Sequence, residues 1–121
     1  MKKLGIILVF ASLVGAAGWA QGTKNIEGTG QRLHLRWLEY QKQARDDRSA
    51  LLWESGMFMG FVSGVSAVLE GTQTISPPAD ITLGQKCAVV GRYLEAHPEE
   101  WNKHEAIIVL KALLEAWPPK Q

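Results

Sequence analysis

The chain has 121 residues, with 13 basic and 12 acidic side chains and a single cysteine. A chain of this length forms one domain, and with one cysteine it must hold its core by packing rather than by an internal disulfide. Its charges are balanced and scattered, which argues against nucleic acid as a partner because phosphate binding needs a clustered positive face.

The first 20 residues have the features of a cleaved secretory signal peptide. Lys2 and Lys3 give a positive start, Leu4–Ala17 is uncharged and mostly apolar, and Gly18 and Ala20 are the small residues that signal peptidase requires. A membrane-spanning helix needs about 20 apolar residues, and this run is shorter. We therefore expect export to the periplasm and no membrane attachment once residues 1–20 are removed.

Residues 21–30 are polar and rich in glycine, which predicts a flexible leader before a folded domain over residues 31–121. The first helix of that domain is expected over about 31–45. Its apolar residues fall on one helical face, with polar residues on the other. They are Leu33, Trp37, Tyr40 and Ala44.

A second helix is expected around the uncharged run Ser55–Leu69, which is too short to cross a bilayer and indicates a central buried helix. Gly56, Gly60 and Gly64 recur within it at every fourth position. Each glycine costs a helix about 1 kcal/mol relative to alanine, so the row predicts close packing against another backbone. That backbone can belong to the same chain or to a second copy, which would make the protein a homodimer.

A third helix should start at Thr82, because Thr82 and Gln85 have the spacing of a capping box, and should run to about His97. Its apolar stripe consists of Leu83, Cys87, Val90 and Leu94. Cys87 is therefore expected to be a small buried hydrophobic residue. A disulfide between two chains and a reactive thiol are the alternatives.

Pro98 suits the first turn of a final helix, and Glu99 and Glu100 would be favourable at its positive end. Residues 106–117 are almost wholly apolar, so most of that helix should be covered. Taken together, the elements predict an all-α fold, a compact bundle of about four helices that follows the signal peptide.

The expected helices carry no recognisable catalytic, cofactor or metal site. His34, His97 and His104 lack the spacing of metal ligands. Ile108 stands where a zinc-protease helix beginning at His104 would need its second histidine, and Ser63 is one place off the nucleophile-elbow pattern. We therefore predict no enzymatic activity and no cofactor. An enzyme would need a pocket that gathers His97 or His104 with glutamates.

Four segments in the second half of the chain have a recognisable order and spacing. They are Gly60–Val65, Pro78–Gln85, Tyr93–Glu99 and Val109–Pro118. In this order they resemble the Rap/Tai family, small periplasmic helical proteins that give immunity to amidase effectors of type VI secretion. The resemblance covers roughly residues 57–119.

The sequence differs from that family at three positions that often hold cysteine. Phe58, Ser76 and Pro119 stand there, so the family's disulfides are absent as a set. Packing can replace such bridges, each of which is worth about 2–4 kcal/mol. The expected fold is therefore unchanged.

The resemblance implies a dimeric plug, which binds a cognate amidase effector and excludes the peptidoglycan peptide from its catalytic cleft. The element expected to enter the cleft is an exposed loop of five residues: Thr72, Gln73, Thr74, Ile75 and Ser76. On this hypothesis, changing Gln73 and Ile75 should weaken effector binding without lowering thermal stability.

Two alternatives remain open. The loop can also be an ordinary connection between two helices. The alternative function is a periplasmic stress-response or chaperone-type protein, which would expose an apolar surface in acid.

Overall fold

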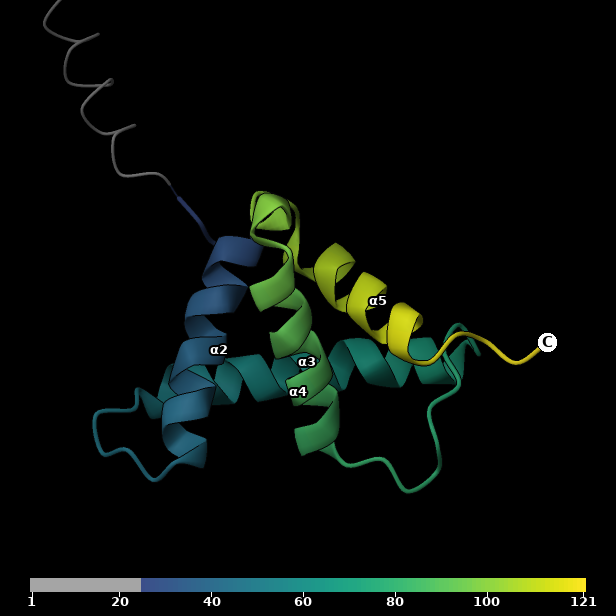
Figure 1. The fold of residues 1–121 in the computed structure, drawn as a ribbon, viewed down its shortest axis with the longest axis horizontal. Helices are drawn as coiled ribbons and strands as arrows, with labels where there is room; N and C mark the ends of the chain where they lie inside the picture. Colours follow the sequence, from purple (N-terminus) through teal and green to yellow (C-terminus); the bar gives the residue numbers. More distant parts are fainter. Residues whose placement is uncertain (1–24) are drawn as a thin grey trace, which may run out of the picture.

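The computed structural model describes residues 25–121, so the expected signal peptide lies outside the described part of the chain. Four α-helices form the domain: α2 (Gly30–Ala44), α3 (Leu52–Gly71), α4 (Leu83–Ala96) and α5 (Glu105–Ala116). A short 3-10 helix, η1 (Pro98–Glu100), lies between α4 and α5. In Figure 1, α2 and α4 stand side by side, α3 crosses behind them, and α5 lies against α4. The predicted all-α bundle of about four helices is confirmed.

The core lies where the inner faces of the four helices meet, and the predicted stripes contribute five of its twelve buried apolar residues. In α2, Leu33 and Trp37 are buried, and in α4 the buried residues include Cys87 and Leu94. Only the stripe positions nearest the helix ends, such as Leu83, are exposed. The full set of buried apolar residues is Leu33, Trp37, Phe58, Val62, Ile75, Cys87, Val90, Leu94, Ile108, Val109, Ala112 and Leu113.

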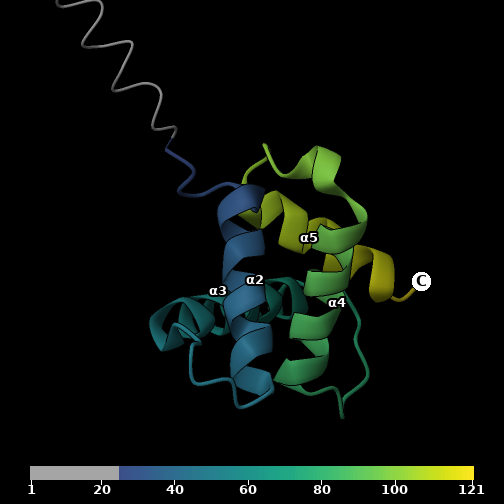
Figure 2. The same ribbon diagram turned by 60° about the vertical axis from the view of Figure 1, so that its left-hand side comes forward.

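Helices α2 and α4, which stand next to one another in Figure 2, approach closely at Gly91. A Cβ atom built on Gly91 would overlap the indole ring of Trp37. The indole Nε1 donates a hydrogen bond to Glu95 Oε1 at 2.8 Å, and the ring packs at an angle against Phe58 of α3. A glycine at position 91 therefore lets α2, α3 and α4 share one large aromatic side chain.

The segment before α2 is part of the domain rather than a flexible leader over its last residues. The carbonyl oxygen of Gly28 accepts a hydrogen bond from the Glu105 amide at 2.8 Å, and the Gly30 amide donates to Lys103 O at 2.9 Å. A Cβ atom on Gly30 would overlap the side chain of Ile108. Residues 28–30, which were expected to belong to the flexible leader over 21–30, are therefore held against the segment 103–105 at the start of α5.

The final helix begins later than predicted. Pro98 starts η1, and α5 begins only at Glu105, where the His104 Nδ1 atom accepts a hydrogen bond from the Ala106 amide at 3.1 Å. Between them, Trp101 Nε1 donates to the carbonyl oxygen of Leu94 at 2.9 Å, which turns the chain back over α4. This turn separates Glu99 and Glu100 from the helix that they were expected to start.

One other local prediction can be compared directly with the structure. The capping box is confirmed, since the Gln85 amide donates to Thr82 Oγ1 at 3.1 Å and the Thr82 amide donates to Gln85 Oε1 at 2.8 Å.

At Ser76, one of the three positions where the family that the sequence resembles often has cysteine, hydrogen bonds join the loop after α3 to the C-terminal tail. The Ser76 amide donates to Trp117 O at 3.1 Å, and Ser76 Oγ accepts from the Lys120 amide at 3.2 Å. These two hydrogen bonds therefore join the loop after α3 to the C-terminal residues that follow α5.

Candidate functional site

The loop predicted to bind a partner follows directly on α3 and is held in a fixed shape. Thr72 caps the helix, with its hydroxyl donating to Val68 O at 2.8 Å, and the Thr74 amide donates to Leu69 O at 2.8 Å. Gln73 at the tip is exposed and has a φ of 58°, a left-handed conformation that a non-glycine residue adopts at some cost. The tip therefore projects polar side chains from a rigid base.

Ile75 is not part of the exposed loop surface. Its side chain is only 2% exposed and belongs to the core. Thr74 and Ser76 on either side of it are half-buried. The expectation that Ile75 lies on the exposed surface of the loop is therefore contradicted, and we expect its replacement to lower thermal stability. Thr72 and Gln73 are the loop residues that remain exposed.

A hollow of about 440 Å³ lies beside the tip of the loop. Its lining residues are Glu70, Gln73, Ile75, Ser76, Pro77 and Lys120. Glu70 accepts hydrogen bonds from Lys86 Nζ at 2.9 Å and from Ser66 Oγ at 2.8 Å, and these two contacts, chiefly that with Lys86, lower the pKa of its carboxyl. The Glu70 carboxylate that lines this hollow is therefore ionised at neutral pH and is paired with the Lys86 ammonium group.

Helix α3 is not the central buried helix that its composition predicted. It is buried on one side only, at Ser55, Phe58, Val62 and Ser66. A Cβ atom on Gly56, Gly60 or Gly64 would meet nothing within 4 Å, so no other described element packs against the glycine row. Packing of that row within the described part of the chain is therefore excluded. By length and composition α3 could also cross a membrane, a test that the core helix of a soluble protein passes equally.

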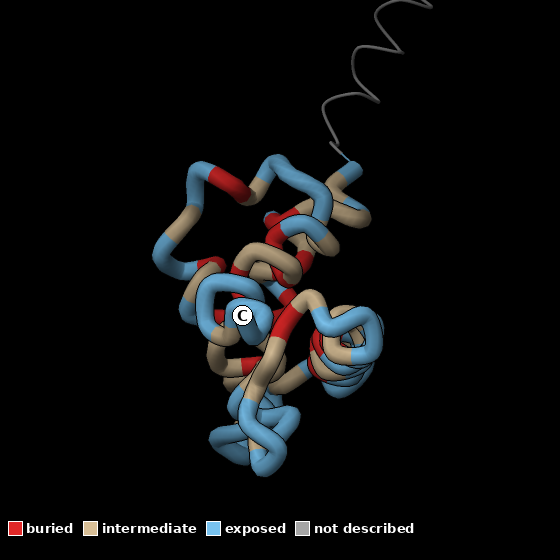
Figure 3. The backbone as a smooth tube through the Cα atoms, turned by 90° about the vertical axis from the view of Figure 1, so that its right-hand side faces the viewer, coloured by how far each residue is buried: buried red, intermediate tan, exposed pale blue. Residues whose placement is uncertain are grey.

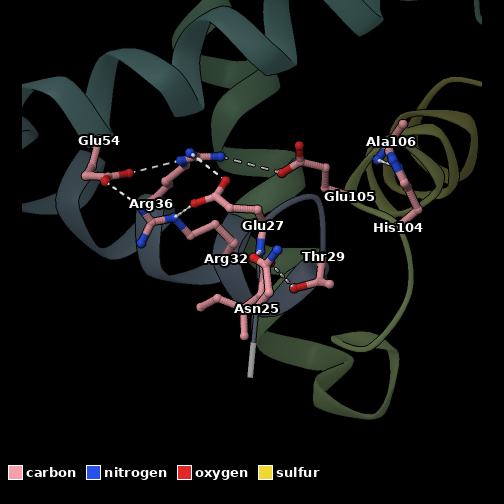
Figure 4. Close-up of polar contacts among 10 residues, drawn as sticks. Asn25, Glu27, Thr29, Arg32, Arg36, Glu54, His104, Glu105 and Ala106 are labelled. Carbon is pink, nitrogen blue, oxygen red and sulfur yellow. Dashed lines mark hydrogen bonds and ion pairs between the residues drawn. The ribbon is translucent and has the colours of Figure 1, made fainter. Parts of the chain in front are cut away.

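A cluster of charged side chains that the sequence did not predict joins the N-terminal segment to α2, α3 and α5 (Figure 4). At its centre is Arg36, whose side chain is only 9% exposed. Its Nε donates to Glu54 Oε2 at 2.9 Å, and its Nη2 donates to Glu27 Oε2 at 3.4 Å. Arg32 Nη2 binds the other Glu54 oxygen at 2.6 Å. The cluster therefore links four segments of the chain through two guanidinium groups.

Glu105 is the least well paired member of this charged cluster. Its Oε2 atom is buried without a hydrogen-bond partner and lies 3.7 Å from Arg36 Nη1, which is an ion pair beyond hydrogen-bonding distance. Burial raises the pKa of the Glu105 carboxyl, and the nearby charge of Arg36 only partly opposes this. Nothing in the local sequence separates Glu105 from an ordinary surface glutamate.

Glu100 ties η1 to the neighbouring helices. Its carboxylate accepts hydrogen bonds from Tyr93 Oη at 2.7 Å, from Lys111 Nζ at 2.9 Å and from Lys103 Nζ at 3.3 Å. These bonds, led by that from Lys111, lower the pKa of Glu100 to about 2. With His97 and Glu99 it is the one set of potential metal ligands in residues 25–121 whose ligand atoms lie within 4.8 Å of one another. Because both Glu100 oxygens already accept donors from this chain, the contacts explain a structural role.

The three histidines lie on different elements. His34 stacks on Trp101 with ring centroids 4.1 Å apart, and burial lowers its pKa. His97 Nδ1 lies 3.0 Å from Glu99 Oε1 at the rim of a shallow hollow of about 320 Å³ between α4 and α5, while His104 caps α5. Each histidine thus has a local contact that explains its position.

Cys87 is fully buried, as predicted, and burial raises the pKa of its thiol to about 11. Only about one thiol in a thousand should then be ionised at pH 8. We expect a thiol-specific reagent such as DTNB to label the native protein at least about 100-fold more slowly than the protein unfolded in urea. Rapid labelling of the native state would contradict this, and so would a disulfide-linked dimer on a non-reducing gel.

Comparison with known proteins shows which family the chain belongs to. The family model for Rap1a immunity proteins matches residues 29–119, which includes all four helices and the loop after α3. No curated protein and no solved structure matches the chain. The chain therefore belongs to the family of Rap1a immunity proteins, which implies an immunity protein that binds an effector of type VI secretion.

Proposed function

We propose that the protein acts in the periplasm, where it binds a peptidoglycan amidase effector of type VI secretion and blocks its catalytic cleft. The family match over residues 29–119 is the observation that carries this proposal. The signal-like composition of residues 1–20 supports export to the compartment in which such an effector would meet its substrate.

Blocking a catalytic cleft requires a surface that is complementary to the cleft and needs no catalytic groups. The loop after α3 supplies a suitable element. Gln73 presents an exposed amide group, which can pair with the polar groups that hold a peptide substrate. Thr72 beside it is exposed, with its hydroxyl proton donated to Val68 O. Ile75 fixes the base of the loop in the core. A loop that is already ordered loses little conformational entropy on binding, which favours tight inhibition.

We further propose that the inhibitory unit is a homodimer. The exposed, uncharged face of α3 supports this, because no described element of the same chain covers its glycine row.

Replacing Gln73 with glycine should separate binding from stability. Glycine adopts a positive φ freely, so the free energy of unfolding should stay the same or rise by up to about 1 kcal/mol. The loss of the amide side chain should weaken inhibition of the cognate amidase by at least about tenfold. The measurement is hydrolysis of peptidoglycan peptides by purified type VI amidase effectors, titrated with the protein and its variant.

The matched control is Asp46→Gly. Asp46 is the other non-glycine residue with a positive φ in residues 25–121, at 57°, and it precedes α3 whereas Gln73 follows it. Both variants should show the same change in stability, and only Gln73→Gly should lose inhibition. Equal inhibition by both variants would remove the loop from the proposal. A protein that suppresses aggregation of unrelated substrates and leaves every amidase active would instead be of the chaperone type.

A further inference from the structure

The C-terminal tail runs beside the loop after α3 and is fastened to it. The Ser76 amide donates to Trp117 O at 3.1 Å, and the Lys120 amide donates to Ser76 Oγ at 3.2 Å. Pro118 and Pro119 stand between these two contacts, and each proline fixes its own φ angle. In Figure 3 the end of the tail faces the viewer and is pale blue, the colour of exposed residues. The tail therefore brings Lys120 to an exposed position beside the loop.

Lys120 and Glu70 are the two charged residues that line the hollow of about 440 Å³ beside the tip of the loop. Their charges are not equally free. The Glu70 carboxylate is paired with Lys86 Nζ at 2.9 Å, whereas Lys120 forms no ion pair with any carboxylate of residues 25–121. The hollow therefore presents one positive charge that the described part of the chain leaves uncompensated.

The other lining residues add a hydrogen-bond donor and an apolar wall to this charge. Gln73, at the tip of the loop, lines the hollow and has an exposed amide group with two N–H donors. Ile75 and Pro77 contribute apolar atoms to the lining. A carboxylate carries the charge opposite to that of an ammonium group and accepts hydrogen bonds on both oxygens. It is therefore the side-chain group that matches the ammonium group and the amide together.

We infer that this hollow receives an aspartate or glutamate side chain of the effector, held by the Lys120 ammonium group and the Gln73 amide. This contact deepens the proposed function and rests on it. If the tip of the loop enters the catalytic cleft, the hollow beside the tip meets the rim of the cleft rather than its catalytic groups. Lys120 then contributes to the choice of partner, because an acidic rim is attracted and a basic rim is repelled.

Reversing the charge of Lys120 tests this contact. Lys120→Glu should weaken inhibition of the cognate amidase at least about 30-fold, because two like charges then face one another across the interface. Lys120→Met removes the charge without reversing it and should weaken inhibition by about 3- to 10-fold. The measurement is hydrolysis of peptidoglycan peptides by the purified effector, titrated with each variant. The loss caused by Lys120→Glu should shrink between about 50 mM and about 500 mM salt, since salt screens the two charges.

Both variants should keep the wild-type Tm to within about 3 °C. The Lys120 residue is exposed, and its hydrogen bond to Ser76 uses the backbone amide, which substitution leaves in place. A loss of inhibition at unchanged Tm therefore reports on the side-chain contact and not on the fold.

Arg48→Glu is the matched control because it makes the same change in net charge. Arg48 is exposed in the connection before α3, whereas the loop follows α3. This variant should inhibit like the wild type to within about threefold. The acidic partner is then located by changing each aspartate and glutamate around the effector's cleft to lysine in turn. One of these changes should restore inhibition by Lys120→Glu, as expected for two charges in contact.

Three results would overturn the inference and leave the proposed function standing. They are full inhibition by Lys120→Glu, an equal loss with Lys120→Glu and Arg48→Glu, which would indicate an effect of net charge alone, and a failure of every charge reversal in the effector to restore inhibition. In each of these cases the wild-type protein still inhibits. If the wild-type protein inhibited no amidase, the proposed function would fall, and the acidic contact would fall with it.

Discussion

Replacing Arg36 with methionine should lower the free energy of unfolding at pH 7 by about 3–5 kcal/mol. The guanidinium group is nearly buried and is the shared partner of Glu54, at 2.9 Å, and of Glu105, at 3.7 Å. Methionine keeps the aliphatic stem but removes every donor. Glu105 then loses its ion-pair partner in a site with little access to water, and Glu54 keeps only its bond to Arg32. The measurement is urea unfolding followed by tryptophan fluorescence.

The loss should depend on pH through Glu105. Burial raises the pKa of this carboxyl above its ordinary value of 4.5, and Arg36 opposes the shift, so removal of Arg36 should raise the pKa further. A carboxyl with a raised pKa binds its proton more tightly in the folded state, and stability therefore falls as pH rises from about 4.5 through the folded pKa. The deficit of Arg36→Met should thus be larger at pH 7 than at pH 4.

Arg48→Met is the matched control, because Arg48 is exposed in the connection between α2 and α3 and lies outside the cluster. Surface changes of this kind usually alter stability by less than about 0.5 kcal/mol. If Arg36→Met cost no more than the control, or if its deficit grew toward acid pH, the charged cluster would not contribute to holding the N-terminal segment against the domain.

The buried faces of α2 and α4 could be predicted because each helix has one apolar stripe and one polar side. Leu33 and Trp37 in α2, and Cys87 and Leu94 in α4, repeat at helical spacing and are buried. The same reasoning was wrong for α3. Its residues are small or apolar on every side, so periodicity cannot tell the face that packs on this chain from the face left exposed.

Contacts between distant segments were beyond the reach of sequence patterns. Arg36 and Glu54 are 18 residues apart, and only the turn between α2 and α3 brings them together. The burial of Ile75 also has no periodic signal, since it is a single apolar residue in a polar loop. The loop between α3 and α4 was therefore placed correctly in the chain, but Ile75, a core residue, was assigned to its exposed surface.

Gly91→Ala should destabilise the protein by about 1–3 kcal/mol, although alanine is intrinsically the better helix former by about 1 kcal/mol. The added methyl group would overlap the indole ring of Trp37. That ring has little freedom to move, since its Nε1 is bonded to Glu95 at 2.8 Å and its faces contact Tyr40 and Phe58. The methyl group must therefore push α4 away from α2, which opens gaps elsewhere in the core.

The same substitution at Gly71 provides the control, because a Cβ atom there meets nothing within 4 Å. Gly71→Ala should be neutral or slightly stabilising, so two identical changes in helical glycines should have opposite signs. Thermal unfolding followed by circular dichroism measures both. A neutral Gly91→Ala would mean that α2 and α4 can separate without cost, and the indole of Trp37 would then not be the contact that fixes their distance.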